Sequence, residues 1–481
     1  MNSKHIAAIE IGSSRVKGIV AAVESDGRIK TLAIEEAPTG DAVRYGRVQN
    51  ARETSDLIND ILRRLENAPQ VAPGHISTVF IADGGRSLKS FSSDASINIG
   101  GPEEITHRIL DRLHREARFN LGTELDILAV APRRYFVDSS EVKKIVGTFG
   151  SSVRGEFTLI TQSPENHRAL DRLVIESHGE DVRRDYVTRL LAQTEMALTD
   201  SERQIGVLFI DFGAETTSMA AFRDGALVFA ATLPIGAANI TRDLSSGLLV
   251  TLDKAENIKR TKGQAVVDRT KFDAPDDEVR EIVDFVSSRA GEIIANVVNI
   301  IDEAGFRTSD FPDGIVISGG GTKLKGFTEM VESVTKMKVR RAEIDNTVTS
   351  AIGALNAADD FDIVAIAKYA AAHSDIDSLS FPEGIDKPVI EETPASTPVR
   401  PAPEPQRVSQ GLRREVKEDD PDLLKDDDPL DQPDNVNDDV DRDNDLPDPD
   451  NDPNKTRLTL MERIKNLFGS PFEAEDKGMD L

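Results

Sequence analysis

Three short segments of the sequence place glycine, hydroxyl and charged side chains directly after apolar runs. In the first segment a carboxylate ends the run, and glycine, two hydroxyls and a cation follow: Glu10, Gly12, Ser13, Ser14 and Lys17. Backbone N–H groups and hydroxyls in such a turn can bind phosphate oxygens. The segment therefore indicates a phosphate-binding turn.

The second segment repeats this order far along the chain, with Asp211, Gly213, Thr216 and Thr217. The third segment is an apolar run that leads into Gly319, Gly320 and Gly321, where the backbone can approach a flat ligand closely. Two related turns so far apart predict two duplicated domains that face one cleft.

The elements that position these turns are strands. The runs His5–Ile11, Val207–Asp211 and Gly314–Ile317 each lead into a glycine-containing turn, and patterns typical of helices separate them. This alternation is typical of an α/β protein.

Composition limits the class of protein. A chain of 481 residues with 38% hydrophobic content can form at least two domains. The absence of cysteine excludes a disulfide scaffold, a cysteine zinc site and a cysteine nucleophile. A net charge of −27 argues against non-specific binding of nucleic acid. Because Met1–Ser14 is too short and polar for a signal peptide and no apolar stretch reaches about 18 residues, we expect a cytosolic chain whose membrane contact is peripheral.

The C-terminal part of the chain has a different composition. Residues 380–453 are rich in proline and then aspartate, and we expect a disordered acidic linker. Residues 455–468 regain a helical pattern, with an apolar face formed by Leu458, Met461, Ile464, Leu467 and Phe468. Arg463 and Lys465 lie beside this face. The pattern predicts an amphipathic helix that binds an anionic membrane surface, and docking on the protein itself or on a partner is the alternative.

The three turns resemble the phosphate-1, phosphate-2 and adenosine motifs of the superfamily that contains actin, sugar kinases and heat-shock chaperone ATPases. Ala255–Arg260 is similar to the purine-contacting helix of that superfamily, with Glu256 and Lys259 one turn apart on one face. An exposed ion pair is the other interpretation of these two residues.

Within the superfamily, residues 5–375 most resemble the bacterial cell-division family FtsA. The segments Leu191–Thr199 and Pro234–Asp243 are similar to the connecting helix and the later strand and helix start of that family. Residues 83–162 look like the FtsA-type insertion. The resemblance implies an α/β actin-like ATPase fold, with two duplicated domains around a nucleotide cleft and an FtsA-type inserted subdomain.

The resemblance also implies domain boundaries. The expected parts are a first actin-like subdomain of residues 1–82, 163–199 and 345–379, an inserted subdomain of residues 83–162, a second actin-like subdomain of residues 200–243 and 314–344, and a smaller second-half subdomain of residues 244–313.

The site residues implied by the resemblance are those of an ATP and Mg²⁺ site. Ser13, Ser14 and Lys17 would meet the β- and γ-phosphates from one side, and Gly213, Thr216 and Thr217 from the other. Asp211, with Glu10 beside it, would hold Mg²⁺ through waters. The nucleoside would contact Glu256, Lys259, Gly319, Gly320, Gly321 and Lys323.

This sequence departs from the superfamily pattern at four positions. Glu10 replaces aspartate, Ala214 and Glu215 replace two glycines, and Ser218 replaces an acidic residue. A carboxylate near a triphosphate costs Coulomb energy unless it turns away or meets the metal. We therefore expect nucleotide binding with slow or absent hydrolysis, and Gln193 and Glu195 are the only candidates for a residue that positions water.

The function implied by the resemblance is that of an adaptor at the division site. It would self-associate, bind filaments of the tubulin homologue FtsZ and hold them at the cytoplasmic face of the cell membrane. A kinase of the same superfamily, a chaperone-type ATPase and a pilus-assembly actin homologue are the alternatives.

Overall fold

The computed structural model describes residues 4–121 and 124–381. Its first sheet has six strands in the order β14-β7-β1-β2-β3-β20. These strands are β14 (Arg183–Thr188), β7 (Thr78–Asp83), β1 (Lys4–Ile11), β2 (Arg15–Val23), β3 (Ile29–Pro38) and β20 (Val348–Ser350).

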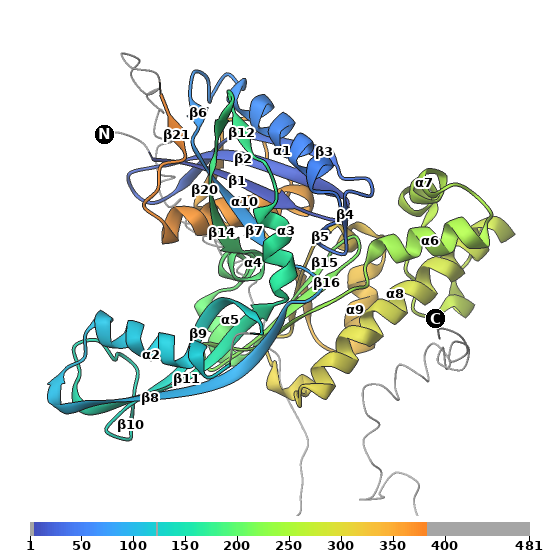
Figure 1. Cartoon of the computed structure of the whole chain (residues 1–481). Helices are drawn as coiled ribbons and strands as arrows, with labels where there is room; N and C mark the ends of the chain where they lie inside the picture. The colour runs from blue at the N-terminus through green and yellow to red at the C-terminus, as the bar shows by residue number, and fades with distance from the viewer. Residues whose placement is uncertain (1–3, 122–123, 382–481) are drawn as a thin grey trace, which may run out of the picture. The chain divides into compact units, whose positions relative to one another are not determined.

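Helices cover both faces of this sheet. Successive side chains of a strand point to opposite faces, so each strand contributes to a core on either side. Ile6 and Ala8 of β1 pack in one core with α10 (Ala357–His373), and Ala7 and Ile9 pack in another with α1 (Ala51–Glu66) (Figure 1). The other helices of the half that contains this sheet are α3 (Pro164–Asp171) and α4 (Arg189–Ala197).

The second sheet has nine strands in the order β10-β9-β11-β8-β17-β16-β15-β18-β19. Its strands are β10 (Ser140–Val142), β9 (Asp126–Val137), β11 (Phe149–Gln162), β8 (Lys89–Glu104), β17 (Ala226–Leu233), β16 (Thr217–Arg223), β15 (Val207–Phe212), β18 (Ile315–Ser318) and β19 (Val339–Arg341). The three strands predicted from the sequence correspond to β1, β15 and β18, so the α/β prediction is confirmed.

The inserted segment forms the far end of this sheet and has its own core. β8 and β11 pair along their length, and α2 (His107–Phe119) lies against them (Figure 1). Leu113 of α2 packs there with Ile97 and Phe157. Within the described residues, β8 pairs with β17 at a single position, where Ala231 lies opposite Lys89. The insertion is therefore tied to the second sheet near one end of β8.

The helices of the second half pack on the other strands of the nine-stranded sheet or on one another. They are α5 (Asp200–Ile205), α6 (Ala237–Gly247), α7 (Leu252–Lys262), α8 (Asp277–Glu303) and α9 (Phe327–Thr335). Asp276 caps the N-terminus of α8, where its side chain accepts from Val279 N. The helix buries a stripe that includes Ile282, Val286 and Ile293. No helix of the described residues is both long and apolar enough to cross a membrane.

Short elements complete the described chain. They are β4 (Val43–Arg44), β5 (Arg47–Val48), β6 (His75–Ile76), β12 (Glu176–Ser177), β13 (Glu180–Asp181), β21 (Leu379–Ser380) and the 3₁₀ turns η1 (Arg269–Lys271), η2 (Thr308–Asp310) and η3 (Gly320–Lys323). The predicted amphipathic helix, with Leu458, Met461, Ile464, Leu467, Phe468, Arg463 and Lys465, lies outside the described residues, as does nearly all of the predicted linker.

Candidate functional site

The first two predicted turns are hairpins of the same local geometry. Gly12 N donates to Arg15 O at 3.0 Å between β1 and β2, and Gly213 N donates to Thr216 O at 2.9 Å between β15 and β16. A Cβ atom on either glycine would come within 2.9 Å of that same carbonyl oxygen. Both turns therefore require glycine at the corresponding position, in agreement with the predicted duplication.

The third turn packs directly on the second hairpin. β18 runs parallel to β15 with Ser318 opposite Asp211, so Gly319 follows at the end of the strand. Gly319 has φ +88° and ψ 162°, and a Cβ there would lie 2.3 Å from Asp211 Oδ1. A Cβ on Gly320 would meet no described atom within 4 Å beyond its chain neighbours. Gly320 is thus the glycine of this turn that faces open space.

Three carboxylates gather beside the two hairpins. Glu10 and Asp211 are 8% and 3% exposed. Burial and the nearby Asp362 of α10 raise the pKa of Glu10 to about 7 and that of Asp211 to about 6. Arg189 of α4 lies 3.8 Å from Glu10, measured from Nη1 to Oε1, and its charge opposes both shifts. A cluster with more carboxylates than cations is suited to a further cation.

One atom of this cluster tests the predicted Mg²⁺ directly. Asp211 Oδ1 is buried and has no hydrogen-bond partner among the residues that the structure describes. A buried carboxylate oxygen without a donor is costly, and carboxylate oxygens and water are the ligands that Mg²⁺ prefers. The residues present therefore fit a magnesium ion held through water by Asp211 and Glu10.

Glu215, the unexpected carboxylate of the second turn, is neutralised by arginine. Arg44 Nε donates to its two carboxylate oxygens at 2.9 and 3.2 Å, Arg242 forms a second ion pair, and Tyr45 N donates at 2.7 Å. The predicted charge conflict is thus resolved inside the protein, because Glu215 turns toward two cations from β4 and α6.

The predicted phosphate-contacting hydroxyls differ in their surroundings. Ser13 accepts a hydrogen bond from Gly46 N at 2.7 Å, and Ser14 is exposed. Thr217 is fully buried and donates to Ile235 O at 2.8 Å, and Ser218 pairs with Thr232 at 2.9 Å. The hydroxyl of Thr217 is therefore used inside the sheet, while Ser14 remains accessible.

The predicted nucleoside contacts fall into two separate networks. Glu256 and Lys259 of α7 pair at 2.6 Å, and Thr241 bonds to both. Burial lowers the pKa of Lys259. Lys323 instead pairs with Asp359 at the start of α10. The backbone carbonyl oxygen of Asp359 also accepts a hydrogen bond from Lys17.

The two candidates for positioning water are separated by the structure. Gln193 Nε2 donates to Asp362 Oδ1 at 2.8 Å, next to the carboxylate cluster. Glu195 instead lies 2.9 Å from His373 Nε2 on the exposed side of α4. Residues two apart on a helix face different directions, so Glu195 does not reach the cluster.

Several residues of the site were not predicted from the sequence. Asp362 and Arg44 come from α10 and β4, which no motif marked. Arg189 and Arg242 lie on α4 and α6, which the family resemblance marked in part without giving these two residues a role. The available signal was the i, i+4 spacing of Arg189 and Gln193, which puts both on one face of α4.

Comparisons with known proteins concern the family of the chain. A family model described as "Cell division protein FtsA" matches residues 208–372, and a model described as "SHS2 domain inserted in FTSA" matches residues 85–161. The curated protein "Cell division protein FtsA" of Porphyromonas gingivalis is 28% identical over 364 residues, which are 71% of this chain and 74% of that protein. Its namesake in Pseudomonas aeruginosa is 26% identical over 356 residues, 70% of this chain and 83% of that protein.

A solved structure supports the fold alone. The "PilM-PilN type IV pilus biogenesis complex" aligns with a TM-score of 0.55 at 14% identity, covering 77% of this chain and 99% of that chain. The predicted actin-like fold with an FtsA-type insertion is confirmed. This chain belongs to the FtsA family, within the superfamily of actin-like ATPases.

Proposed function

We propose that this protein is a cell-division adaptor that binds ATP with Mg²⁺, self-associates and holds FtsZ filaments at the cytoplasmic face of the membrane. The cell-division part rests on the names of the family model and the curated relatives. The nucleotide part rests on one observation: the buried, unpartnered Asp211 Oδ1 lies against Gly319, next to the open face of Gly320.

The proposed site assigns each chemical task to particular residues. The turn N–H groups and Ser14 bind phosphate oxygens, while Asp211 and Glu10 orient the waters of the metal. Bound Mg²⁺ would neutralise phosphate charge. Gln193 lies beside Asp362 with its Oε1 unpartnered among the described residues, so it can accept from a water near the cluster. A glutamine is a weak base, which favours slow hydrolysis.

Substitution of Gly320 by valine tests the nucleotide site. The valine side chain would fill the open space beside the triple-glycine turn, and we expect at least a tenfold loss of ATP affinity in isothermal titration calorimetry. Gly101→Val is a matched control, because a Cβ on Gly101 also meets no described atom within 4 Å and this glycine lies in the inserted subdomain. Equal ATP affinity of Gly320→Val and wild type would refute the proposed cleft.

Vesicle co-sedimentation tests the membrane part. The full chain with ATP should pellet with vesicles that contain anionic lipid, and Ile464→Asp should reduce pelleting because a charge on the apolar face opposes insertion. Ile464→Leu keeps that face and is the control. A further arm adds FtsZ, which should pellet only with protein that binds the vesicles. If FtsZ pellets equally without this protein, its role as an adaptor fails.

A further inference from the structure

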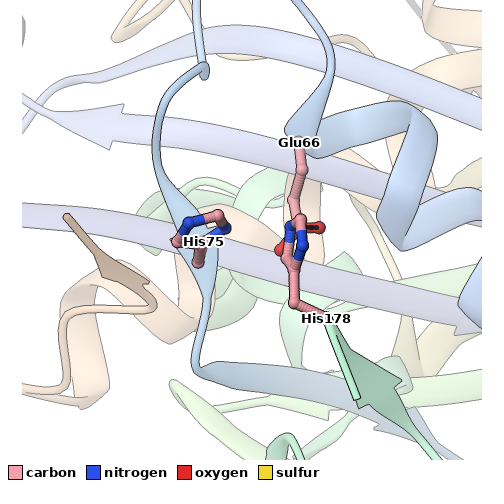
Figure 2. A group of neighbouring side chains, drawn as sticks. All are labelled: Glu66, His75 and His178. Atoms are coloured by element: carbon pink, nitrogen blue, oxygen red, sulfur yellow. Dashed lines mark ion pairs between the residues drawn. The ribbon is translucent and has the colours of Figure 1, made fainter. Parts of the chain in front are cut away.

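Glu66 and His75 lie close together in the sequence, and the fold brings His178 to them from about a hundred residues further along the chain. Glu66 is the last residue of α1, His75 begins β6, and His178 lies in the turn between β12 and β13 (Figure 2). One ligand atom from each residue lies within 4.8 Å of the others. None of these residues belongs to the carboxylate cluster described above.

This donor set suits a particular class of metal. Two imidazoles and a carboxylate favour zinc and related transition metals, whereas Mg²⁺ and Ca²⁺ prefer oxygen ligands. Zinc–ligand bonds of about 2.0–2.1 Å in a tetrahedron put neighbouring ligand atoms roughly 3.3 Å apart. Glu66 Oε2 and His178 Nε2 are separated by 3.3 Å.

The carboxylate of Glu66 is oriented by the residues next to the two histidines. Its Oε1 atom accepts from Ile76 N at 2.7 Å and from Ser177 Oγ at 2.5 Å. Ile76 follows His75, and Ser177 precedes His178. The second oxygen is thereby directed toward His178, as expected of hydrogen bonds that position a metal ligand.

Both histidines show features that an ordinary surface ion pair does not explain. His75 Nδ1 is buried and has no hydrogen-bond partner in the described part of the chain. His178 has φ +52° and precedes Gly179 in a two-residue turn. Asparagine or aspartate usually occupies this position of such a turn. A residue kept in a costly conformation can indicate a function for its side chain.

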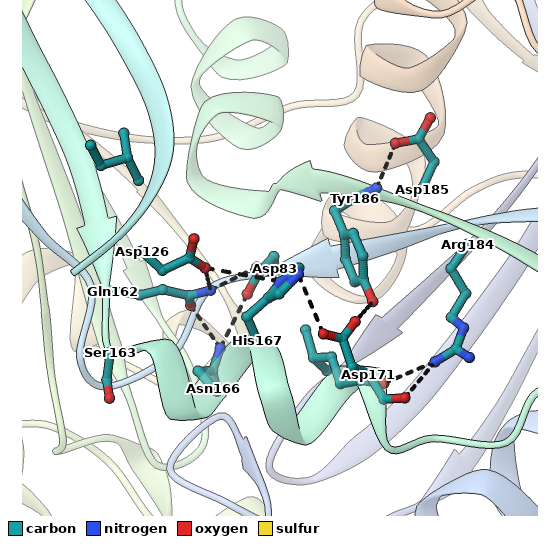
Figure 3. A network of polar contacts seen from close by, with 12 residues as sticks. Asp83, Asp126, Gln162, Ser163, Asn166, His167, Asp171, Arg184, Asp185 and Tyr186 are labelled. Carbon is teal, nitrogen blue, oxygen red and sulfur yellow. Dashed lines mark hydrogen bonds and ion pairs between the residues drawn. The ribbon is translucent and has the colours of Figure 1, made fainter. Parts of the chain in front are cut away.

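A second group of side chains with metal-ligand atoms consists of Asp83, Asp126 and His167, and it differs from the first in how its carboxylate is satisfied. Asp83 is buried where the inserted segment joins β7, and amides already satisfy both of its oxygens (Figure 3). Gln162 Nε2 donates to Oδ2 at 2.7 Å and Asn166 Nδ2 donates to Oδ1 at 3.1 Å. This network needs no cation to satisfy Asp83.

We propose that Glu66, His75 and His178 bind one Zn²⁺ ion, with water at the remaining position, and that the ion ties the end of α1 to β6 and the β12–β13 turn. His178 supplies the open side of the site, because its side chain is 61% exposed, while that of Glu66 is 6% exposed. The ion would cross-link segments about a hundred residues apart in sequence, which stabilises the folded state through binding that the unfolded chain lacks.

The test uses the full-length chain after treatment with a chelator and dialysis. Titration with ZnCl₂ in a calorimeter should give one tight site per chain, and Zn²⁺ should raise the melting temperature. His178→Ala should weaken binding at least tenfold and remove the rise, since loss of a residue that only orients a ligand already costs 10- to 100-fold. Its side chain is exposed, so this variant should fold. The titration is repeated with excess MgCl₂, which should occupy the carboxylate cluster and leave the affinity of the Glu66–His75–His178 site for Zn²⁺ unchanged.

Two matched variants separate this site from other histidines. His107→Ala, at an exposed position of α2, and His167→Ala, in the second group, should bind Zn²⁺ as wild type does. The proposal is overturned if wild type binds no Zn²⁺ at micromolar concentration, if His178→Ala binds as tightly as wild type, or if His167→Ala alone abolishes the site. ATP binding is measured separately, so failure here does not affect the proposed nucleotide site.

Discussion

Replacing Gly319 by alanine should destabilise the protein more than any other small change in the triple-glycine turn. Two features of the structure act together at this position. The backbone has φ +88° and ψ 162°, a region that is essentially restricted to glycine. A methyl group would also lie 2.3 Å from Asp211 Oδ1 and 2.5 Å from Phe212 O.

The expected size of the effect follows from these two terms. The backbone conformation costs a non-glycine residue about 1–3 kcal/mol, and forcing a methyl group into a packed site costs about 1–3 kcal/mol. Because the chain can relax one strain partly at the expense of the other, we expect a loss of about 2–5 kcal/mol in the free energy of unfolding. At about 2 °C per kcal/mol, the melting temperature should fall by roughly 4–10 °C.

Differential scanning calorimetry of nucleotide-free protein is the assay, with Gly320→Ala as the control. A Cβ on Gly320 meets open space, so this variant should stay within about 0.5 kcal/mol of wild type. The reasoning is refuted if Gly319→Ala melts within about 1 °C of wild type, because such a shift corresponds to only about 0.5 kcal/mol of unfolding free energy. It is equally refuted if Gly320→Ala loses as much stability as Gly319→Ala.

Three further predictions concern two charged groups of the site and the rate of ATP turnover. Glu215→Gln should cost about 1–3 kcal/mol of unfolding free energy in a urea titration, because Arg44 and Arg242 lose their charged partner. As a control, Glu165→Gln, which removes the charge from an exposed pair with Arg47, should cost less than about 1 kcal/mol. Without Mg²⁺, the melting temperature should fall as pH rises from 5 to 7. The reason is that folded Glu10 keeps its proton up to a pKa of about 7, while the unfolded carboxyl loses its proton near 4.5. Glu10→Gln should flatten this dependence on pH, and an unchanged slope would contradict the assignment. ATP turnover without a partner should stay below about 1 per second, and phosphate release in the usual enzyme range would favour the kinase alternative.

The strands, hairpins and glycine turns could be predicted from the sequence because their signals are local. A strand that ends in a glycine turn needs only consecutive residues, and Gly12, Gly213 and Gly319 lie where backbone contacts require glycine. The insertion could be predicted because it occupies one continuous stretch. Patterns that depend on neighbours along the chain are therefore recovered well.

The rest of the site depends on which segments meet in space. Asp362 completes the carboxylate cluster from α10, which follows the first hairpin by most of the chain. Glu195 was named with Gln193 as a candidate for positioning water, but the rotation of the helix directs it to His373. Glu66, His75 and His178 have no regular spacing, so no sequence motif could connect them.

Glu215 illustrates how a departure from a family pattern acquires a physical role. With glycines in this turn, Arg44 and Arg242 would lack their shared partner, and both guanidinium groups also lie within 6 Å of the Tyr45 ring centroid. With glutamate present, one negative charge faces two positive charges, and Asp41, the other partner of Arg44, is 95% exposed to screening water. The turn and its two arginines therefore carry an excess of positive charge. Since Arg44 belongs to β4 and Arg242 to α6, Glu215 also joins the two halves of the fold beside the proposed phosphate site. A residue that first suggested repulsion of a triphosphate thus fixes the cations that would attract it.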